Sequence, residues 1–191
     1  MDEYYSFVFR GLLTEEALDR AGRKSKPIFS DEEEAKVSER LCIDLMDENF
    51  VQPAKKMAIV YTAICTFENS LREFITKKLL EQFGENWWTK GVSDNVRKYA
   101  ENRKKEEENA KWHSQRGEQL INYTDFGHLI SIMTKNWALF EPHIRDLEWA
   151  RQILMTLQRS RNVIMHSGEL EPADIERIGT NIRDWLRQTG L

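Results

Sequence analysis

The sequence predicts an all-α protein, a compact bundle of four to five core helices with one polar helical insertion. Three observations favour this class. The 191 residues include only 9 glycines and 4 prolines, too few for the many turns of a β-sandwich or barrel. Apolar residues recur every three or four positions over several long segments, as on one face of a helix. Hydrophobic residues (40 %) and charged residues (31 %) occur in globular proportions.

The first helices are predicted from a start signal and a periodic stripe. Ser30 and Glu33 form a capping box, which predicts a helix from there to about Asn49, and Pro53 is expected to separate it from the next helix. The clearest stripe falls in residues 54–83 and ends at Gly84. Its apolar members are Met57, Val60, Ile64, Phe67, Leu71 and Phe74.

Glu68 and Arg72 flank this stripe four residues apart. Two interpretations remain open. They can form an ion pair along the helix surface, or the carboxylate can orient another group in a cleft.

The segment from about 85 to 122 is predicted to be a polar insertion, since residues 101–109 contain no apolar side chain to bury. It holds the densest basic cluster of the chain, which includes Arg103, Lys104 and Lys105. One interpretation is a solvated helix face. The other is an RNA contact, because the nearby aromatic rings of Tyr99 and Trp112 can stack on bases.

Three further helices are predicted toward the C-terminus. A short one covers 125–140, and a longer one begins near His143 and ends near Gly168. Pro172 is expected at the first position of the last helix. The apolar stripes of the two longer helices are Leu147, Ala150, Leu154 and Leu157, and Ile175, Ile178, Ile182 and Trp185.

Residues 1–29 are predicted to be an N-terminal extension of unknown role, and residues 30–191 one helical domain. The extension carries an aromatic cluster between Tyr4 and Phe9, which can pack on the body or bind a partner.

Charge and motif absences exclude several functional classes. The net charge of −4 excludes a globally basic nucleic-acid binder. HExxH, CxxC, GxxxxGK, GxGxxG and GxSxG are all missing, so we expect no metal and no cofactor. Cys42 and Cys65 are expected to be thiols in a reducing compartment. The acidic start and the lack of an apolar run near ~20 residues favour a cytoplasmic protein without a membrane partner.

One helix stripe changes character at its end. Position 161 continues the stripe of the helix that begins near His143, yet it is Arg161. Asn162 and His166 share a helix face, and Arg161 can reach the same space. Imidazole, guanidinium and amide together suit metal-independent RNA cleavage by the neighbouring 2′-hydroxyl. Alternatively, Arg161 extends to solvent and His166 caps the helix end.

The run RNVIMH at residues 161–166 resembles the R-N-x-x-x-H signature of the HEPN superfamily (higher eukaryotes and prokaryotes nucleotide-binding domains). The segment 67–72 and the polar insertion are also similar to HEPN proteins of bacterial toxin and phage-defence systems. The resemblance covers roughly residues 35–188.

This resemblance implies an endoribonuclease whose two motifs face each other across a homodimer cleft. Arg161 would then hold the phosphate, and His166 would act as acid, base or positioning group. Asn162 would be the polar residue after the arginine, with Glu68 and Arg72 in supporting places. Such proteins often act as toxins restrained by an antitoxin, or as abortive-infection effectors.

Two other functions remain open from the sequence. The same groove can belong to a non-catalytic module that binds a nucleotide or a partner protein. In a third interpretation, residues 97–116 are the main nucleic-acid contact, and binding falls steeply with salt.

Overall fold

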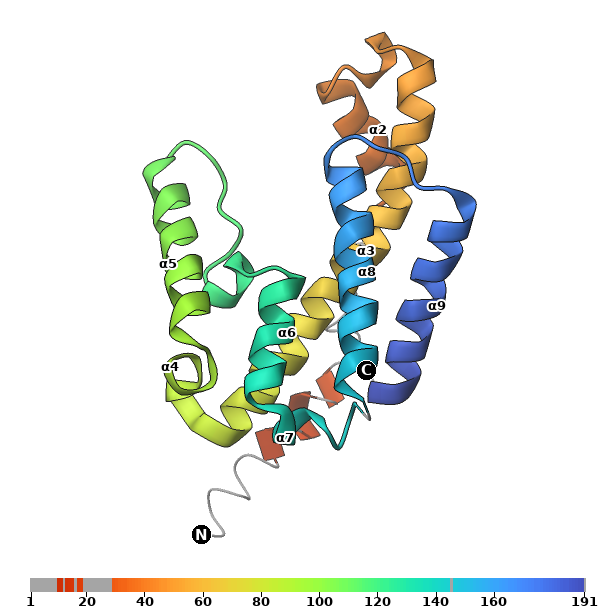
Figure 1. Ribbon diagram of the computed structural model, residues 1–191. Coiled ribbons are helices and arrows are strands. Elements are labelled where there is room, and N and C mark those ends of the chain that lie inside the picture. Colours follow the sequence, from red (N-terminus) through yellow and green to blue (C-terminus); the bar gives the residue numbers. More distant parts are fainter. Residues whose placement is uncertain (1–9, 12, 16, 19–28, 145, 191) are drawn as a thin grey trace. The chain divides into compact units, whose positions relative to one another are not determined.

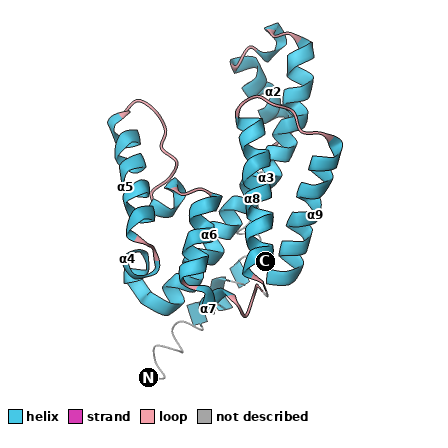
Figure 2. Ribbon diagram, viewed as in Figure 1, coloured by secondary structure: helices cyan, strands magenta, loops and turns pink. Residues whose placement is uncertain are grey.

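All regular secondary structure in the computed structural model is helical over the residues that it describes, which confirms the predicted all-α class (Figure 2). The described residues are 10–11, 13–15, 17–18, 29–144 and 146–190. The aromatic cluster predicted near the N-terminus lies outside them. The chain divides into two compact units, Met1–Asp47 and Glu48–Leu191. The domain limits predicted from the sequence remain a prediction.

In the first unit, helix α2 (Asp31–Arg40) begins as predicted. The Ser30 hydroxyl accepts a hydrogen bond from the Glu33 backbone N–H, and the Glu33 carboxylate accepts one from the Ser30 N–H. The prediction that this helix runs to about Asn49 is wrong. Cys42 adopts a left-handed backbone conformation (φ 53°), which a continuing helix cannot contain, and the short 3₁₀ helix η2 (Ile43–Leu45) follows.

The second unit is built on the long helix α3 (Glu48–Phe83). Pro53 does not separate two helices, as the sequence suggested, but lies inside α3. Its position explains why the helix tolerates it. The first four N–H groups of a helix have no partner within it, so a proline at the sixth residue removes only one bond of the ladder.

The apolar stripe of α3 is buried from Met57 to Phe74, as its spacing predicted, and the buried face continues through Ile75 and Leu79. The helix ends at Phe83, one residue before Gly84, whose φ of 60° is readily available only to glycine. The predicted stop is therefore confirmed.

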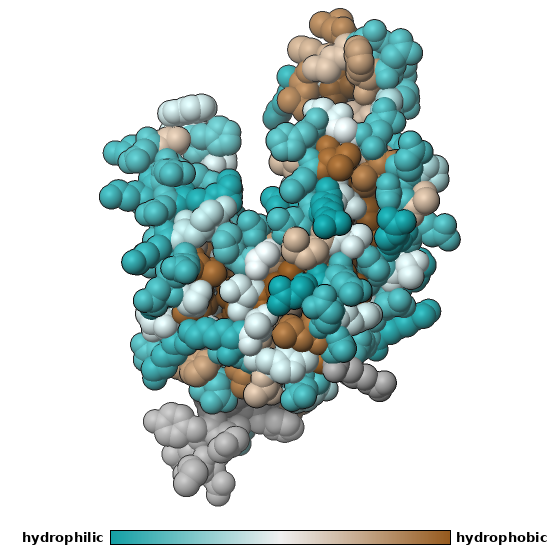
Figure 3. All heavy atoms as spheres, viewed as in Figure 1, coloured by the Kyte–Doolittle hydropathy of each residue, from teal (hydrophilic) through white to brown (hydrophobic). Residues whose placement is uncertain are grey.

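A polar excursion follows α3. Residues of η3 (Gly84–Asn86) and α4 (Trp87–Gly91) turn the chain into α5 (Asp94–Asn109). Only Val96 and Ala100 of α5 are buried, and its main neighbour is η4 (Leu120–Tyr123). In the view of Figure 3, hydrophilic residues cover most of the surface over α5. Helix α5 therefore buries few side chains, because residues 101–109 contain no apolar one.

Four more helices complete the second unit: α6 (Phe126–Lys135), α7 (Trp137–Phe140), α8 (Leu147–Met165) and α9 (Pro172–Thr189). The single helix expected over 125–140 is interrupted at Asn136, whose amide donates to the carbonyls of Gly91 and Ile132. Helix α8 begins at Leu147 and not near His143, because the Asp146 carboxylate caps its first turn through the Trp149 N–H.

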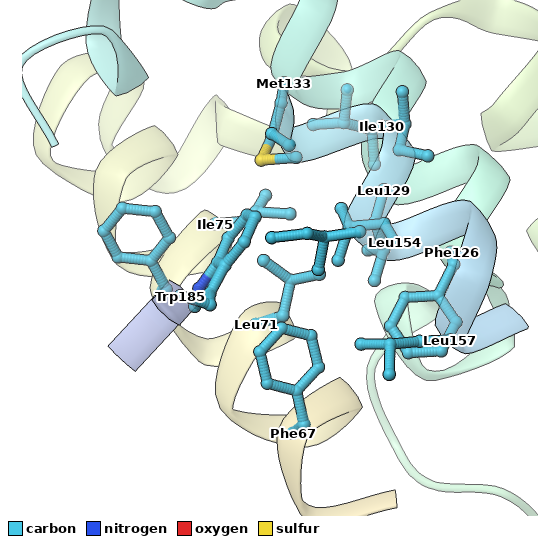
Figure 4. Packing of buried hydrophobic residues seen from close by; sticks show 14 of the residues in the cluster. Phe67, Leu71, Ile75, Phe126, Leu129, Ile130, Met133, Leu154, Leu157 and Trp185 are labelled. Atoms are coloured by element: carbon cyan, nitrogen blue, oxygen red, sulfur yellow. The ribbon is translucent and has the colours of Figure 1, made fainter. Parts of the chain in front are cut away.

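Helix α3 packs against α6, α8 and α9, and α8 also packs against α6 and α9 (Figure 1). The core lies between these four helices (Figure 4). Phe67, Leu71 and Ile75 come from α3, and Trp185 closes the core from α9. No helix within the described ranges is long and apolar enough to cross a membrane.

Trp185 is the largest fully buried side chain, so it offers the clearest test of this core. Its ring meets the Phe67 ring edge-on at 5.6 Å and stacks on Trp149 at 5.7 Å. We expect Trp185→Ala to lower the free energy of unfolding by about 3–5 kcal/mol, because the cavity cannot refill. Trp112→Ala is the matched control: this ring is 86 % exposed, and its loss should cost less than about 0.5 kcal/mol. Equal urea midpoints for the two variants would contradict this packing.

Candidate functional site

The C-terminal end of α8 is closed by a defined backbone motif that places His166. The N–H of Gly168 donates to the carbonyl of Val163 at 2.8 Å, and the N–H of Ser167 donates to Ile164 at 3.0 Å. Ser167 has a φ of 61°, so this is a Schellman ending with serine in the left-handed position. Glycine is favoured at position 168, since a Cβ would lie 2.8 Å from the Val163 Cγ1 and 3.0 Å from the Val163 carbonyl oxygen. His166 is thereby held at the helix boundary.

The three polar residues of the motif do not share one environment. Asn162 and His166 are exposed, whereas the Arg161 side chain is 27 % exposed and lies against α3. No hydrogen bond or ion pair within the described part of the chain joins Arg161 to the other two side chains. Five helical positions separate Arg161 from His166, which places them about 140° apart around the helix. Within one chain, Arg161 is therefore separated from Asn162 and His166.

Arg161 instead meets Glu68, a carboxylate buried in the wall of the bundle. The Arg161 Nε lies 3.7 Å from one Glu68 oxygen, and the Arg72 Nη2 lies 2.5 Å from the other. The Glu68 side chain is only 6 % exposed. Two guanidinium groups from different helices thus share one buried negative charge, which holds Arg161 in place beside α3.

Arg72 is tied to three parts of the structure. Besides Glu68, its guanidinium donates to the Asn69 side chain and to the backbone carbonyl of Thr124, each at 2.9 Å. Burial lowers the pKa of the Arg72 guanidinium; the nearby Arg161 charge acts in the same direction, and Glu68 opposes both. Arg72 therefore links α3 to the turn before α6 and supports the position of Glu68.

Tyr61 lies one helical turn before Cys65 on the same side of α3. Burial raises the pKa of the Tyr61 phenol, as do Cys65 and Glu68, while the Arg161 charge lowers it. The hydroxyl therefore stays protonated at neutral pH and can donate a hydrogen bond.

Sequence reasoning missed Tyr61 and the contact between Arg161 and Glu68. A signal for both was present, because the side chains with hydrogen-bonding groups at 61, 65, 68 and 72 follow a helical spacing of their own beside the apolar stripe. This second stripe on α3 faces the position where the stripe of α8 changes to arginine. The second stripe on α3 and the arginine that ends the stripe of α8, taken together, indicate the contact between Arg161 and Glu68.

The basic cluster of α5 lies apart from this network and is partly used within the fold. Arg103 donates to the Tyr99 hydroxyl at 2.7 Å and lies over its ring, and Lys104 donates to the carbonyl of Glu118 at 3.0 Å. Lys105 is exposed. Two of the three candidate RNA contacts thus already have intramolecular partners.

An apolar depression of about 520 Å³ lies next to the end of α8. It is formed between the start of α3, including Phe50, Met57 and Tyr61, and residues around Met165. The Phe50 and Met165 side chains that line it are both more than half exposed. A concentration of exposed apolar surface of this kind is typical of a protein interface.

Within the described residues, no three His, Cys, Asp or Glu side chains are grouped so that they could hold a metal ion. The arrangement offers instead a guanidinium fixed by a buried carboxylate, an exposed imidazole at a helix end, and an amide one turn before it. These groups can bind a phosphate and transfer a proton.

Comparison with known proteins adds one family. Residues 63–190, about two thirds of the chain, match the model for Swt1-like HEPN domains. No curated protein and no solved structure matches the chain. The matched range includes Glu68, Arg72 and the whole 161–166 run, but it begins after Tyr61.

Proposed function

The chain belongs to the Swt1-like HEPN family, and from this membership we propose that it is an endoribonuclease that cleaves RNA without a metal ion. The observation that carries the proposal is the buried Glu68 carboxylate, which fixes Arg161 at the edge of the motif. A buried ion pair of this kind costs desolvation energy, so its presence favours a role in positioning beyond simple stability.

Arg161 binds the scissile phosphate in this proposal. Its Nε lies 3.7 Å from a Glu68 oxygen, and the two terminal nitrogens of the guanidinium remain for a phosphate oxygen. Because Glu68 already restrains the Arg161 guanidinium, this side chain loses little conformational freedom when RNA binds. The fixed charge stabilises the additional negative charge that develops on the phosphate in the transition state.

His166 transfers the proton, and Asn162 orients either the imidazole or the phosphate. The 2′-oxygen attacks the adjacent phosphorus as His166 accepts its proton, so the 2′-O–P bond forms. The P–O5′ bond breaks, and the leaving oxygen takes up the proton that His166 accepted, which returns the imidazole to its neutral form. The products are a 2′,3′-cyclic phosphate and a 5′-hydroxyl end, and DNA, which lacks the 2′-hydroxyl, is not a substrate.

A homodimer completes the site. One chain separates Arg161 from His166, whereas two copies meeting at the end of α8 bring both motifs to one cleft. The exposed Phe50 and Met165 beside the motif supply apolar surface for this contact. In the same proposal, the basic side chains Arg103, Lys104 and Lys105 of α5 make secondary contacts to the RNA substrate.

We place this activity in a toxin or phage-defence setting, as an abortive-infection effector or a toxin held by an antitoxin protein. The support is the likeness to HEPN toxins in the segment 67–72 and in the polar insertion. A cytoplasmic location is part of the same proposal.

A non-catalytic module that binds a nucleotide or a protein is the second candidate. The exposed apolar side chains of Phe50 and Met165 beside the motif favour it, because such surface is typical of a protein interface. The two functions differ in one measurable way, since only the first breaks the RNA chain.

Replacing Arg161 tests the proposal. We expect Arg161→Ala to lower the rate of RNA cleavage by about 10²–10³-fold, as when one stabilising donor is removed from a charged transition state. Arg161→Lys should restore only part of the rate, because an ammonium lacks the planar fork. Arg159→Ala, an exposed arginine two positions away on α8, is the matched control and should cleave as wild type does. Equal rates in the Arg159 and Arg161 variants would contradict the assignment.

A further inference from the structure

A second, polar groove of about 870 Å³ opens on the other side of the Glu68–Arg72 pair. One wall is the C-terminal half of α3, and the other is the segment 116–122, where the polar insertion returns to the bundle. The side chains that matter below are Asn69, Arg72 and Thr76 on α3 and Arg116, Gln119 and Asn122 on the opposite wall.

The insertion wall is fixed by contacts to α5. The Arg116 Nε lies 2.6 Å from a carboxylate oxygen of Glu107, and the Arg116 backbone N–H donates to the other at 3.1 Å. Lys104 binds the Glu118 carbonyl, and the buried Tyr123 hydroxyl donates to the Gly117 carbonyl at 3.1 Å. The charged residues of α5 therefore hold the second wall of the groove in one conformation.

Gly117 makes room for the side chain that this wall presents. A Cβ at Gly117 would lie 2.7 Å from the Asn122 Nδ2, and the φ of 152° disfavours other residues. Glycine thus allows the Asn122 amide to pack closely against the loop backbone at the edge of the groove.

The groove offers free hydrogen-bonding groups without a net charge. No hydrogen bond joins the side chains of Thr76, Gln119 or Asn122 to any other described residue. The three basic residues of the lining are balanced by the three acidic residues Glu73, Glu81 and Glu118. An amide presents both a donor and an acceptor, the combination that matches the edge of a nucleobase, whereas a phosphate chain favours an excess of positive charge.

The groove also adjoins the proposed catalytic network. Arg72 lines it and donates to Glu68, which in turn holds Arg161. The Arg72 Nε is buried and has no hydrogen-bond partner among the described residues. A nucleotide in the groove would therefore lie only two side chains away from the phosphate that Arg161 binds.

We propose that this groove is a base-recognition subsite for a nucleotide of the RNA substrate, with Gln119 and Asn122 reading the base edge. The polar insertion then determines which RNA sequence is cleaved. The identity of the ligand as RNA rests on the proposed ribonuclease function. The position of the subsite rests on the geometry of the groove.

Binding and cleavage separate the two proposals. Short single-stranded RNAs of the four homopolymer sequences are titrated against full-length protein carrying His166→Ala, alone and combined with Asn122→Ala or Gln119→Ala, by fluorescence anisotropy. We expect each added substitution to weaken binding of the preferred RNA about 5- to 10-fold, the value of one lost hydrogen bond, and to reduce the preference. Asn109→Ala, an exposed asparagine of α5 outside the groove, is the matched control.

Cleavage-site sequencing with the wild-type motif completes the test. Altered cleavage sites in the Asn122 and Gln119 variants, with a retained rate on the best RNA, would support the subsite. Unchanged affinity and unchanged cleavage sites in both variants would overturn it and leave the groove to a protein partner. If no RNA is cleaved but the groove variants still lose RNA affinity, the subsite stands and the ribonuclease proposal fails. Gln119 is exposed, so its variant keeps the test valid if Asn122→Ala does not fold.

Discussion

His166→Ala is expected to lower the rate of RNA cleavage by about 10²–10⁴-fold, the usual contribution of a positioned acid or base. The imidazole is exposed at the end of α8, and the backbone bonds of Ser167 and Gly168 that close the helix do not involve it. The variant should therefore fold as wild type does. Rates on labelled RNA, measured beside urea unfolding curves, check both parts.

His113→Ala is the control for this experiment, because it removes an exposed histidine from the polar insertion. It should cleave RNA at the wild-type rate. Expression gives an independent reading, since an active ribonuclease toxin limits growth of its host and the His166 variant should not. A His166 variant that unfolds would instead assign the imidazole a structural role, and equal growth with both proteins would favour the binding module.

Glu68→Ala is expected to lower the free energy of unfolding by about 3–5 kcal/mol, the range for removing one partner of a buried ion pair. The carboxylate is 6 % exposed and holds two guanidinium groups, so its loss leaves Arg72 buried beside an apolar gap. Urea unfolding, with the slope compared between variants, measures the change.

Glu73→Ala on the same helix is the matched control, because this side chain is exposed and should cost less than about 0.5 kcal/mol. Glu68→Gln separates stability from positioning. The glutamine keeps an oxygen that accepts a hydrogen bond from Arg72 but removes the negative charge that holds Arg161. We therefore expect a smaller loss of unfolding free energy than in Glu68→Ala, together with a clear fall in the rate of RNA cleavage. A loss of stability in Glu68→Ala no larger than in Glu73→Ala would show that the Glu68 pairings are weak in solution.

The fold was predictable where periodicity alone decides it. The stripe from Met57 to Phe74 is buried as its spacing indicated, and Gly84 and Pro172 mark the predicted helix ends. Local rules failed where a neighbouring group decided the boundary. Pro53 is accommodated inside α3, and the Asn136 amide bonds the distant carbonyl of Gly91, a contact that no local pattern contains.

The candidate site was only half accessible from the sequence. The run from Arg161 to His166 could be found, because arginine interrupts an apolar stripe. The pairing of Arg161 with Glu68 was missed, because Glu68 lies 93 positions earlier and also fits an ordinary surface pair with Arg72. The second groove depends on how the insertion folds back at Gly117, which spacing does not encode.

The chemistry of the RNA ends tests the central claim most directly. Wild-type protein and the His166→Ala variant are incubated with end-labelled total RNA and tRNA in excess EDTA, and the product ends are mapped. The proposed mechanism predicts cleavage by the wild type alone, with 2′,3′-cyclic phosphate and 5′-hydroxyl ends. Cleavage by both proteins, or 3′-hydroxyl and 5′-phosphate ends, would contradict a 2′-hydroxyl attack centred on Arg161 and His166, and intact RNA beside folded dimer would contradict the ribonuclease itself.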